Sequence, residues 1–150
     1  MTPHVTNVMQ TFFGTLMAQI APALGSEYLI GSTSVIAMMM SMAGTEYERG
    51  AEVRVMENRE MRTLFAAAAP GIGDSALSRR LEEASGGEDT SLRISDLDRT
   101  NAALKQLLIE LHSHVEELEG PDATDLDRRI WAFMRNAAER RKLPHPLAAA

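Results

Sequence analysis

The sequence predicts an all-α protein, organised as a four- to five-helix up-and-down bundle with one unusually long helix. Apolar residues recur at spacings of three and four residues through most of the 150-residue chain, which is the periodicity of one helix face. With 45% hydrophobic and 24% charged residues, the composition is that of a globular protein rather than a disordered chain. We therefore expect a single bundle domain over residues 1–143 and a flexible C-terminal tail over residues 144–150.

The first helix is predicted between the N-terminus and Pro22. Its apolar face is formed by Val5, Val8, Met9, Phe12, Leu16 and Ile20. Its opposite face is polar or small but uncharged, and is formed by Asn7, Thr11, Gly14 and Ala18. A helix that faces water usually carries charges on its outer side, so we expect the back of this helix to be half-buried as well.

A long second helix is predicted over residues 26–69, with Ser26 as its N-cap. Gly44 and the capping-box pattern of Thr45 and Glu48 could divide it, but the apolar stripe keeps its phase across Gly44, which favours one helix. At ~1.5 Å per residue such a helix would span roughly 65 Å. Because a compact chain of this size is much smaller, the far end of the helix would need a partner.

Pro70 and Gly71 end the long helix. A short helix is expected over residues 74–84, followed by an exposed loop over residues 85–90. A fourth helix is expected over residues 95–119, and a final helix from about residue 122 to residue 143.

The fourth helix carries the most regular pattern in the chain. Leucine recurs every seven residues, at Leu97, Leu104, Leu111 and Leu118, and Asn101 occupies the other core position of the heptad. The pattern resembles a leucine zipper, but no basic region precedes it, as a DNA-binding zipper would require. Leu107 and Ile109 also widen the apolar face. We therefore interpret this segment as a core helix of an antiparallel bundle.

Composition and charge exclude several classes of function. The net charge of −6 argues against general nucleic-acid binding, which needs a positive contact surface. The chain has no cysteine, which excludes disulfides, thiolate metal sites and cysteine nucleophiles. A protein without cysteine also fits the reducing cytoplasm, which is the expected location.

The N-terminal segment is almost free of charge. Residues 1–45 contain no lysine or arginine, and Glu27 is their one acidic residue. Polar residues interrupt the apolar stretches and no basic residues flank them, so membrane insertion is not expected. We expect this segment to be buried in the bundle core and in a homodimer interface. The candidate interface residues are Phe12, Leu16, Met39 and Trp131.

A second set of residues suggests an apolar small-molecule site. Methionine side chains often line adaptable apolar surfaces. The row of inward-facing residues on the long helix also continues into its C-terminal half, which is rich in charged residues. A buried carboxylate there, beside Arg54 or Arg62, could act as an acid or a base. The candidate ligand-binding residues are Met38, Met42, Tyr47, Glu57 and Asn58.

A metal site is the third candidate. Glu110, His114 and Glu117 share one helix face at spacings of four and three residues, and carboxylate and imidazole groups can together bind iron, manganese or zinc. A di-iron bundle needs Glu-x-x-His on two separate helices, and that motif does not occur in the sequence. The three residues are therefore explained as readily by a solvated polar edge.

Three functions follow from these patterns. The favoured hypothesis is a non-enzymatic homo-oligomer, most simply a homodimer, that acts as an interaction or regulatory module. The alternatives are a small-molecule binder with a methionine-lined pocket and a metal or carboxylate enzyme that uses Glu110, His114 and Glu117. No nucleophile elbow, phosphate loop or cofactor motif occurs in the sequence, so no catalytic residue and no cofactor are assigned.

Overall fold

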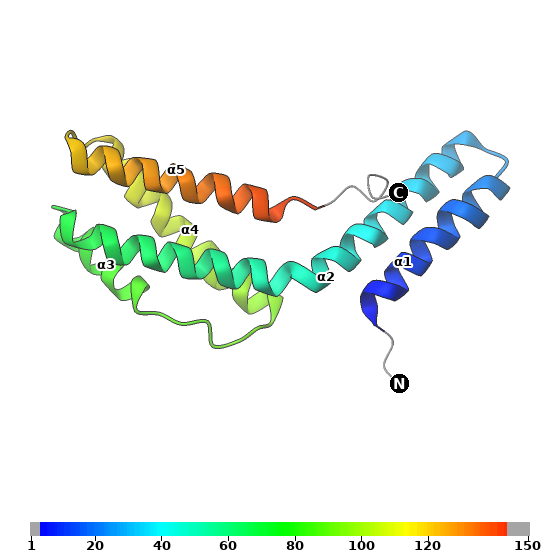
Figure 1. Ribbon diagram of the computed structural model, residues 1–150, viewed down its shortest axis with the longest axis horizontal. Helices are drawn as coiled ribbons and strands as arrows, with labels where there is room; N and C mark the ends of the chain where they lie inside the picture. The colour runs from blue at the N-terminus through cyan, green and yellow to red at the C-terminus, as the bar shows by residue number, and fades with distance from the viewer. Residues whose placement is uncertain (1–3, 144–150) are drawn as a thin grey trace. The chain divides into compact units, whose positions relative to one another are not determined.

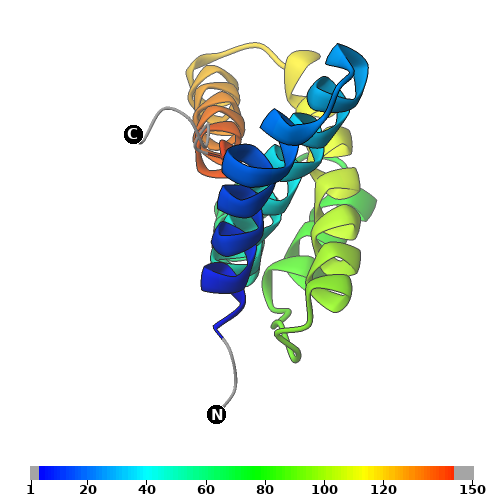
Figure 2. The same ribbon diagram turned by 90° about the vertical axis from the view of Figure 1, so that its right-hand side faces the viewer.

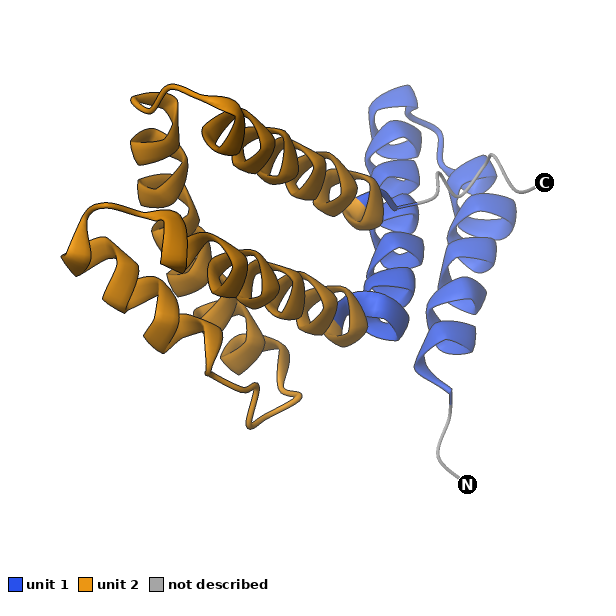
Figure 3. Ribbon diagram, turned by 60° about the vertical axis from the view of Figure 1, so that its left-hand side comes forward, with its two compact units in different colours: residues 1–50, 142–150 blue, residues 51–141 orange. Residues whose placement is uncertain are grey.

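The computed structural model describes residues 4–143, which contain helices and connecting segments and no strand. The predicted all-α fold is therefore confirmed. The chain divides into two compact units, one of residues 1–50 with residues 142–150 and one of residues 51–141 (Figure 3). The single domain expected over residues 1–143 stays a prediction, and the tail expected over residues 144–150 lies outside the described residues.

The first unit is a helical hairpin. Helix α1 (Val5–Thr15) continues through one π-helical turn (Leu16–Ile20) and a 3-10 turn (Ala21–Ala23). Helix α2 (Glu27–Ala68) then returns antiparallel to α1, as Figures 1 and 2 show. Pro22 lies in the 3-10 turn, where its missing N–H and fixed φ help to end the first helix.

Gly44 allows α1 and α2 to approach closely. A Cβ atom at Gly44 would lie 3.0 Å from the Met9 Cβ atom, closer than two packed side-chain carbons normally come. Beside this contact, Gln10 Nε2 donates a hydrogen bond of 3.2 Å to Ser41 Oγ. Helix α2 is continuous through Gly44, as predicted, so this glycine serves helix packing and does not break the helix.

The second unit contains the hydrophobic core. The C-terminal part of α2 is followed by a 3-10 turn (Ala69–Gly71), α3 (Ser75–Ser85), α4 (Ile94–Glu116) and α5 (Pro121–Arg141). Fully buried side chains at its centre are Met61, Phe65, Leu81, Leu111 and Ile130. Apolar burial of this kind is the main favourable term in folding.

Most of the heptad residues of α4 are buried, as predicted. Leu97, Leu104 and Leu111 are buried, and Asn101 is buried with them, whereas Leu118 lies past the helix end and is exposed. Arg93 occupies the N-cap position and the helix begins at Ile94, one residue before its predicted start. Gly120, with φ of 116°, makes the turn into α5 in a conformation that glycine adopts readily.

The prediction that the N-terminal segment is buried in the bundle core is wrong. The core lies between Met61 and Ala137. Along residues 4–50 the large hydrophobic side chains that remain exposed are Phe12, Ile20, Tyr28, Leu29, Val35, Ile36, Met39, Met42 and Tyr47. Since α1 covers a single face of α2, the other faces of this apolar helix are left open.

Asp74 is the N-cap of α3, and its removal should fray that helix. Its Oδ1 atom accepts hydrogen bonds from the backbone N–H groups of Ala76 and Leu77, at 2.8 and 3.1 Å. The same two bonds lower the pKa of the Asp74 carboxyl. In Asp74→Ala we expect the amides of Ala76 and Leu77 to exchange hydrogen faster than in the wild type. Asp74→Asn should keep the slow exchange, and equal rates in all three proteins would contradict the assignment.

Candidate functional site

A buried polar network links three helices of the second unit. Glu57 and Asn58 of α2 and Asn101 of α4 are buried polar residues of the second unit. Buried polar groups are costly unless their hydrogen bonds are made. Each of these three side chains has partners within the unit.

Glu57 lies at the centre of the network. Its Oε1 accepts a hydrogen bond of 2.6 Å from Arg141 Nε, and its Oε2 accepts one of 2.7 Å from Arg141 Nη2. Asn101 Nδ2 donates to Oε2 at 3.1 Å, and Lys105 Nζ lies 3.3 Å from the same oxygen. This bidentate arrangement is the strongest geometry available to an arginine–carboxylate pair.

Asn101 extends the network to the loop before α4. Its Nδ2 also donates to Asn58 Oδ1 at 2.9 Å, and Asn58 Nδ2 donates to Asp89 Oδ1 at 3.1 Å. Asp89 in turn forms a bidentate pair with Arg62, at 3.0 and 3.2 Å. The network therefore joins α2, α4, α5 and the α3–α4 loop.

The electrostatics of the network keep Glu57 ionised. Burial by itself raises the pKa of the Glu57 carboxyl, but the hydrogen bonds from Arg141, with Lys105 and Asn101 adding to them, bring it below its ordinary value. The same hydrogen bonds raise the pKa of the Arg141 guanidinium. A carboxylate with a lowered pKa and both oxygens occupied is a poor general base. This arrangement supports a structural role.

The sequence identified part of this network. Glu57 and Asn58 were predicted to face inward, and they are fully buried. The sequence predicts Arg54 or Arg62 beside the buried carboxylate. In the structure, Arg54 pairs with Asp98 and Arg62 pairs with Asp89 instead. Arg141 was missed because 84 residues separate it from Glu57, and no local pattern links residues so far apart.

The other three ligand-binding candidates, Met38, Met42 and Tyr47, lie in the first unit. Met42 and Tyr47 are exposed and Met38 is half-buried on the N-terminal part of α2. Glu57 and Asn58 belong to the second unit. Four pockets of the second unit are lined by residues other than these five.

The metal candidates share a pocket but not a coordination geometry. Glu110, His114 and Glu117 line a depression of about 310 Å³ beside the start of α3. Within residues 4–143, no group of three or more histidine, aspartate or glutamate side chains is arranged to hold a metal ion. Arg80 instead holds the Glu110 carboxylate in a bidentate pair, at 2.5 and 3.0 Å. That pair lowers the pKa of Glu110.

The interface candidates are partly or largely exposed. Phe12 is 48% exposed, Met39 64% and Trp131 56%, while Leu16 is half-buried. Trp131 contacts His112 edge to face, with ring centroids 5.5 Å apart. These positions leave the side chains available to a partner.

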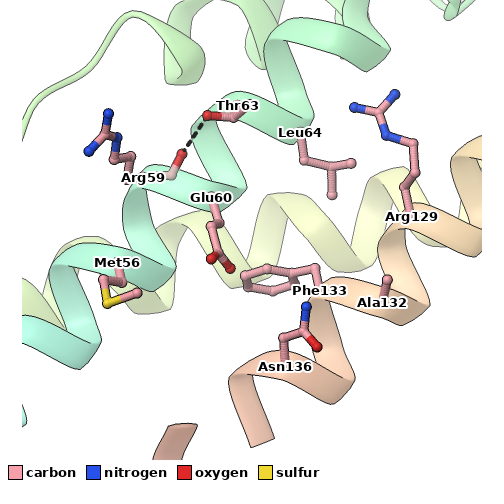
Figure 4. Close-up of a pocket in the computed structure, with 9 residues that line it drawn as sticks. All are labelled: Met56, Arg59, Glu60, Thr63, Leu64, Arg129, Ala132, Phe133 and Asn136. Atoms are coloured by element: carbon pink, nitrogen blue, oxygen red, sulfur yellow. Dashed lines mark hydrogen bonds between the residues drawn. The ribbon is translucent and has the colours of Figure 1, made fainter. Parts of the chain in front are cut away.

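A further feature, which the sequence did not reveal, is a groove between α2 and α5 (Figure 4). Its volume is about 520 Å³, and its lining residues are Met56, Arg59, Glu60, Thr63, Leu64, Arg129, Ala132, Phe133 and Asn136. This size lies within the usual range of small-molecule sites.

Comparison with known proteins gives no further guide to function. No protein-family model matches the chain, and neither a curated protein nor a solved structure is similar to it.

Proposed function

We propose that the protein is a homo-oligomeric interaction module that assembles through the outward face of the N-terminal part of α2. The observation that carries this proposal is a row of exposed apolar side chains along that face. Its exposed side chains are Tyr28, Leu29, Val35, Ile36, Met39, Met42 and Tyr47. Exposed apolar surface of this kind marks interaction sites on proteins.

The spacing along this face favours another helix as the partner. Tyr28, Val35 and Met42 are seven residues apart, and Met39 lies four residues after Val35. Alternating steps of four and three residues form the seam of a coiled coil, into which a matching helix packs its own side chains. A second copy of α2 carries the same seam, so a two-fold symmetric pairing is the simplest arrangement.

The size of the surface also suits a dimer. The seven side chains are on average slightly more than half exposed. If each has a full surface of roughly 200 Å², together they offer about 700–800 Å². A standard interface buries about 800 Å² on each partner, so this face by itself approaches the area that a stable dimer needs.

The outer face of α1 distinguishes this proposal from burial in lipid. Asn7 and Thr11 are exposed on α1, and Gln19 is exposed in the π-helical turn after it. Polar side chains of this kind are unfavourable in the hydrocarbon core of a bilayer. Although Phe12 and Ile20 are exposed as well, the polar residues favour water on the α1 side of the hairpin and protein on the α2 side.

Changing Met39 to lysine should prevent assembly. We expect sedimentation velocity and native mass spectrometry to give a dimer for the wild type and a monomer for Met39→Lys, because the substitution places two like charges close together at the centre of the seam. Ala18→Lys, at an exposed position in the π-helical turn after α1, adds the same charge to the same unit and should remain a dimer. A monomeric wild type, or equal assembly of both variants, would contradict the proposal.

Membrane association is a second candidate with a specific observation behind it. The continuous helix Glu27–Gly71 is long and apolar enough to cross a bilayer, and 17% of the residues in its apolar stretch are buried, so it is not a typical core helix. Flotation of the detergent-free wild type with liposomes tests this candidate. Protein that floats with the vesicles supports insertion, whereas protein that stays in the dense fraction as a dimer supports the self-association proposal.

A further inference from the structure

The groove between α2 and α5 combines an apolar floor with a cationic rim. Leu64 of α2 and Phe133 of α5, both buried in the core, form the floor. Ala132 lies beside Phe133 (Figure 4), and its small side chain leaves space between the two helices. Ion pairs of Arg140 with Glu60 and of Arg141 with Glu57 connect the helices near the end of α5.

Two arginines give the rim its charge. Arg59 and Arg129 lie on opposite sides of the floor, with Leu64 and Phe133 between them (Figure 4). Both are exposed, and neither forms an ion pair with another side chain in the part of the chain that the structure describes. Glu60 is the one acidic residue among the nine lining residues, and Arg140 already neutralises it through a bidentate pair. The lining therefore contributes two arginines against one glutamate, and that glutamate is already paired with Arg140.

We propose that this groove binds a small amphipathic carboxylate, of the class of a medium-chain fatty acid. The guanidinium of Arg129 receives the carboxylate, since arginine donates two parallel N–H groups to such an anion. The apolar chain crosses the nearly buried Leu64 and Phe133 and covers Met56, which is exposed, and Ala132, which is half-buried, so that the apolar surface removed from water is mainly that of these last two residues. Asn136, which also lines the groove from α5, has an amide that can donate a hydrogen bond to a bound ligand.

The two halves of this ligand are both required by the site. A small polar anion such as acetate would leave Met56 and Ala132 exposed to water, and a neutral alcohol would leave Arg129 without a counter-charge. The site is independent of self-association, because all of its residues lie in the second unit and the proposed seam lies in the first.

Titration with decanoate, kept below the concentration at which it aggregates, tests the proposal. We expect saturable binding by calorimetry and amide shifts centred on Ala132 and Phe133, with acetate and decanol each at least about tenfold weaker. Decanol that binds as tightly as decanoate would overturn the role of the arginines. Shifts centred on residues 28–47 would overturn the location, since they would show decanoate on the exposed face of α2.

Three variants test separately the charge of Arg129, the open space of the groove and nonspecific attraction of decanoate to an exposed arginine. Arg129→Ala removes the proposed carboxylate partner and should weaken decanoate binding about tenfold or more. Ala132→Leu fills the groove without changing its charge and should weaken binding to a similar extent. Arg135→Ala removes an exposed arginine of the same helix that does not line the groove, and should leave binding unchanged. Equal effects of Arg129→Ala and Arg135→Ala would overturn the proposal, as would wild-type affinity in Ala132→Leu.

Discussion

Replacing Glu57 by glutamine is expected to lower the free energy of unfolding by roughly 3 kcal/mol, at the lower end of the range for breaking a buried ion pair. The substitution keeps the shape of the side chain but removes the charge that Arg141 and Lys105 face. The estimate lies at the lower end because the Arg141 side chain is 39% exposed, so water compensates part of its lost interaction. Denaturation by urea, monitored by circular dichroism, measures the change.

Glu60→Gln provides the matched control. Glu60 forms the same kind of bidentate pair with Arg140 one turn further along α2, but its side chain is 41% exposed. Exposed pairs contribute at most about 1 kcal/mol. A loss for Glu57→Gln no larger than that for Glu60→Gln would mean that the buried network does not stabilise the bundle.

The network also predicts how stability depends on pH. Because the pKa of Glu57 in the folded state lies below its ordinary value of 4.5, the unfolded state binds more protons in this range and stability rises with pH. The contribution of Glu57 is fully present above about pH 4.5 and is lost as the pH falls through the lower, folded-state value. The free energy of unfolding should therefore decline more steeply below this pH in the wild type than in Glu57→Gln.

Phe65→Ala should produce the second large effect, a loss of about 3–5 kcal/mol, because removing a buried aromatic ring leaves a cavity in addition to the lost burial. Phe65 is fully buried in the core of the second unit. Ile109→Ala is the control, since Ile109 is 59% exposed on α4 and should change stability by no more than about 0.5 kcal/mol. Similar losses in the two variants by thermal or urea unfolding would contradict the assignment of the core.

Periodicity predicted the elements that depend on local sequence. The phase of the apolar stripe correctly favoured a continuous α2 through Gly44, and the heptad of α4 correctly identified Leu97, Leu104 and Leu111 as core residues. The inward positions of Glu57 and Asn58 followed from the same stripe. Such patterns record which side of a helix is covered.

The features that the sequence did not predict depend on which segments meet in space. The uncharged N-terminal segment was expected in the bundle core, yet α1 packs on α2 near Met9 and Gly44 and leaves the opposite face of α2 open. The absence of charged residues indicates that a segment must be covered, but it does not identify the element or partner that covers it. The pairing of Arg141 with Glu57 and the groove beside Arg129 likewise join helices that are distant in the chain.

Asn101 has a consequence for how α4 finds its place during folding. Leucine repeats every seven residues along this helix, so a copy of α4 shifted lengthwise by two turns would still present leucines to its neighbours. The shift would, however, bring Ile94 or Leu108 to the place where Asn101 now donates to Glu57 and Asn58. Asn58 Oδ1 would then lose the donor that Asn101 provides, at a cost of about 1–3 kcal/mol, while Glu57 would keep its pair with Arg141. One amide thus selects a single alignment from several that the leucines alone would accept.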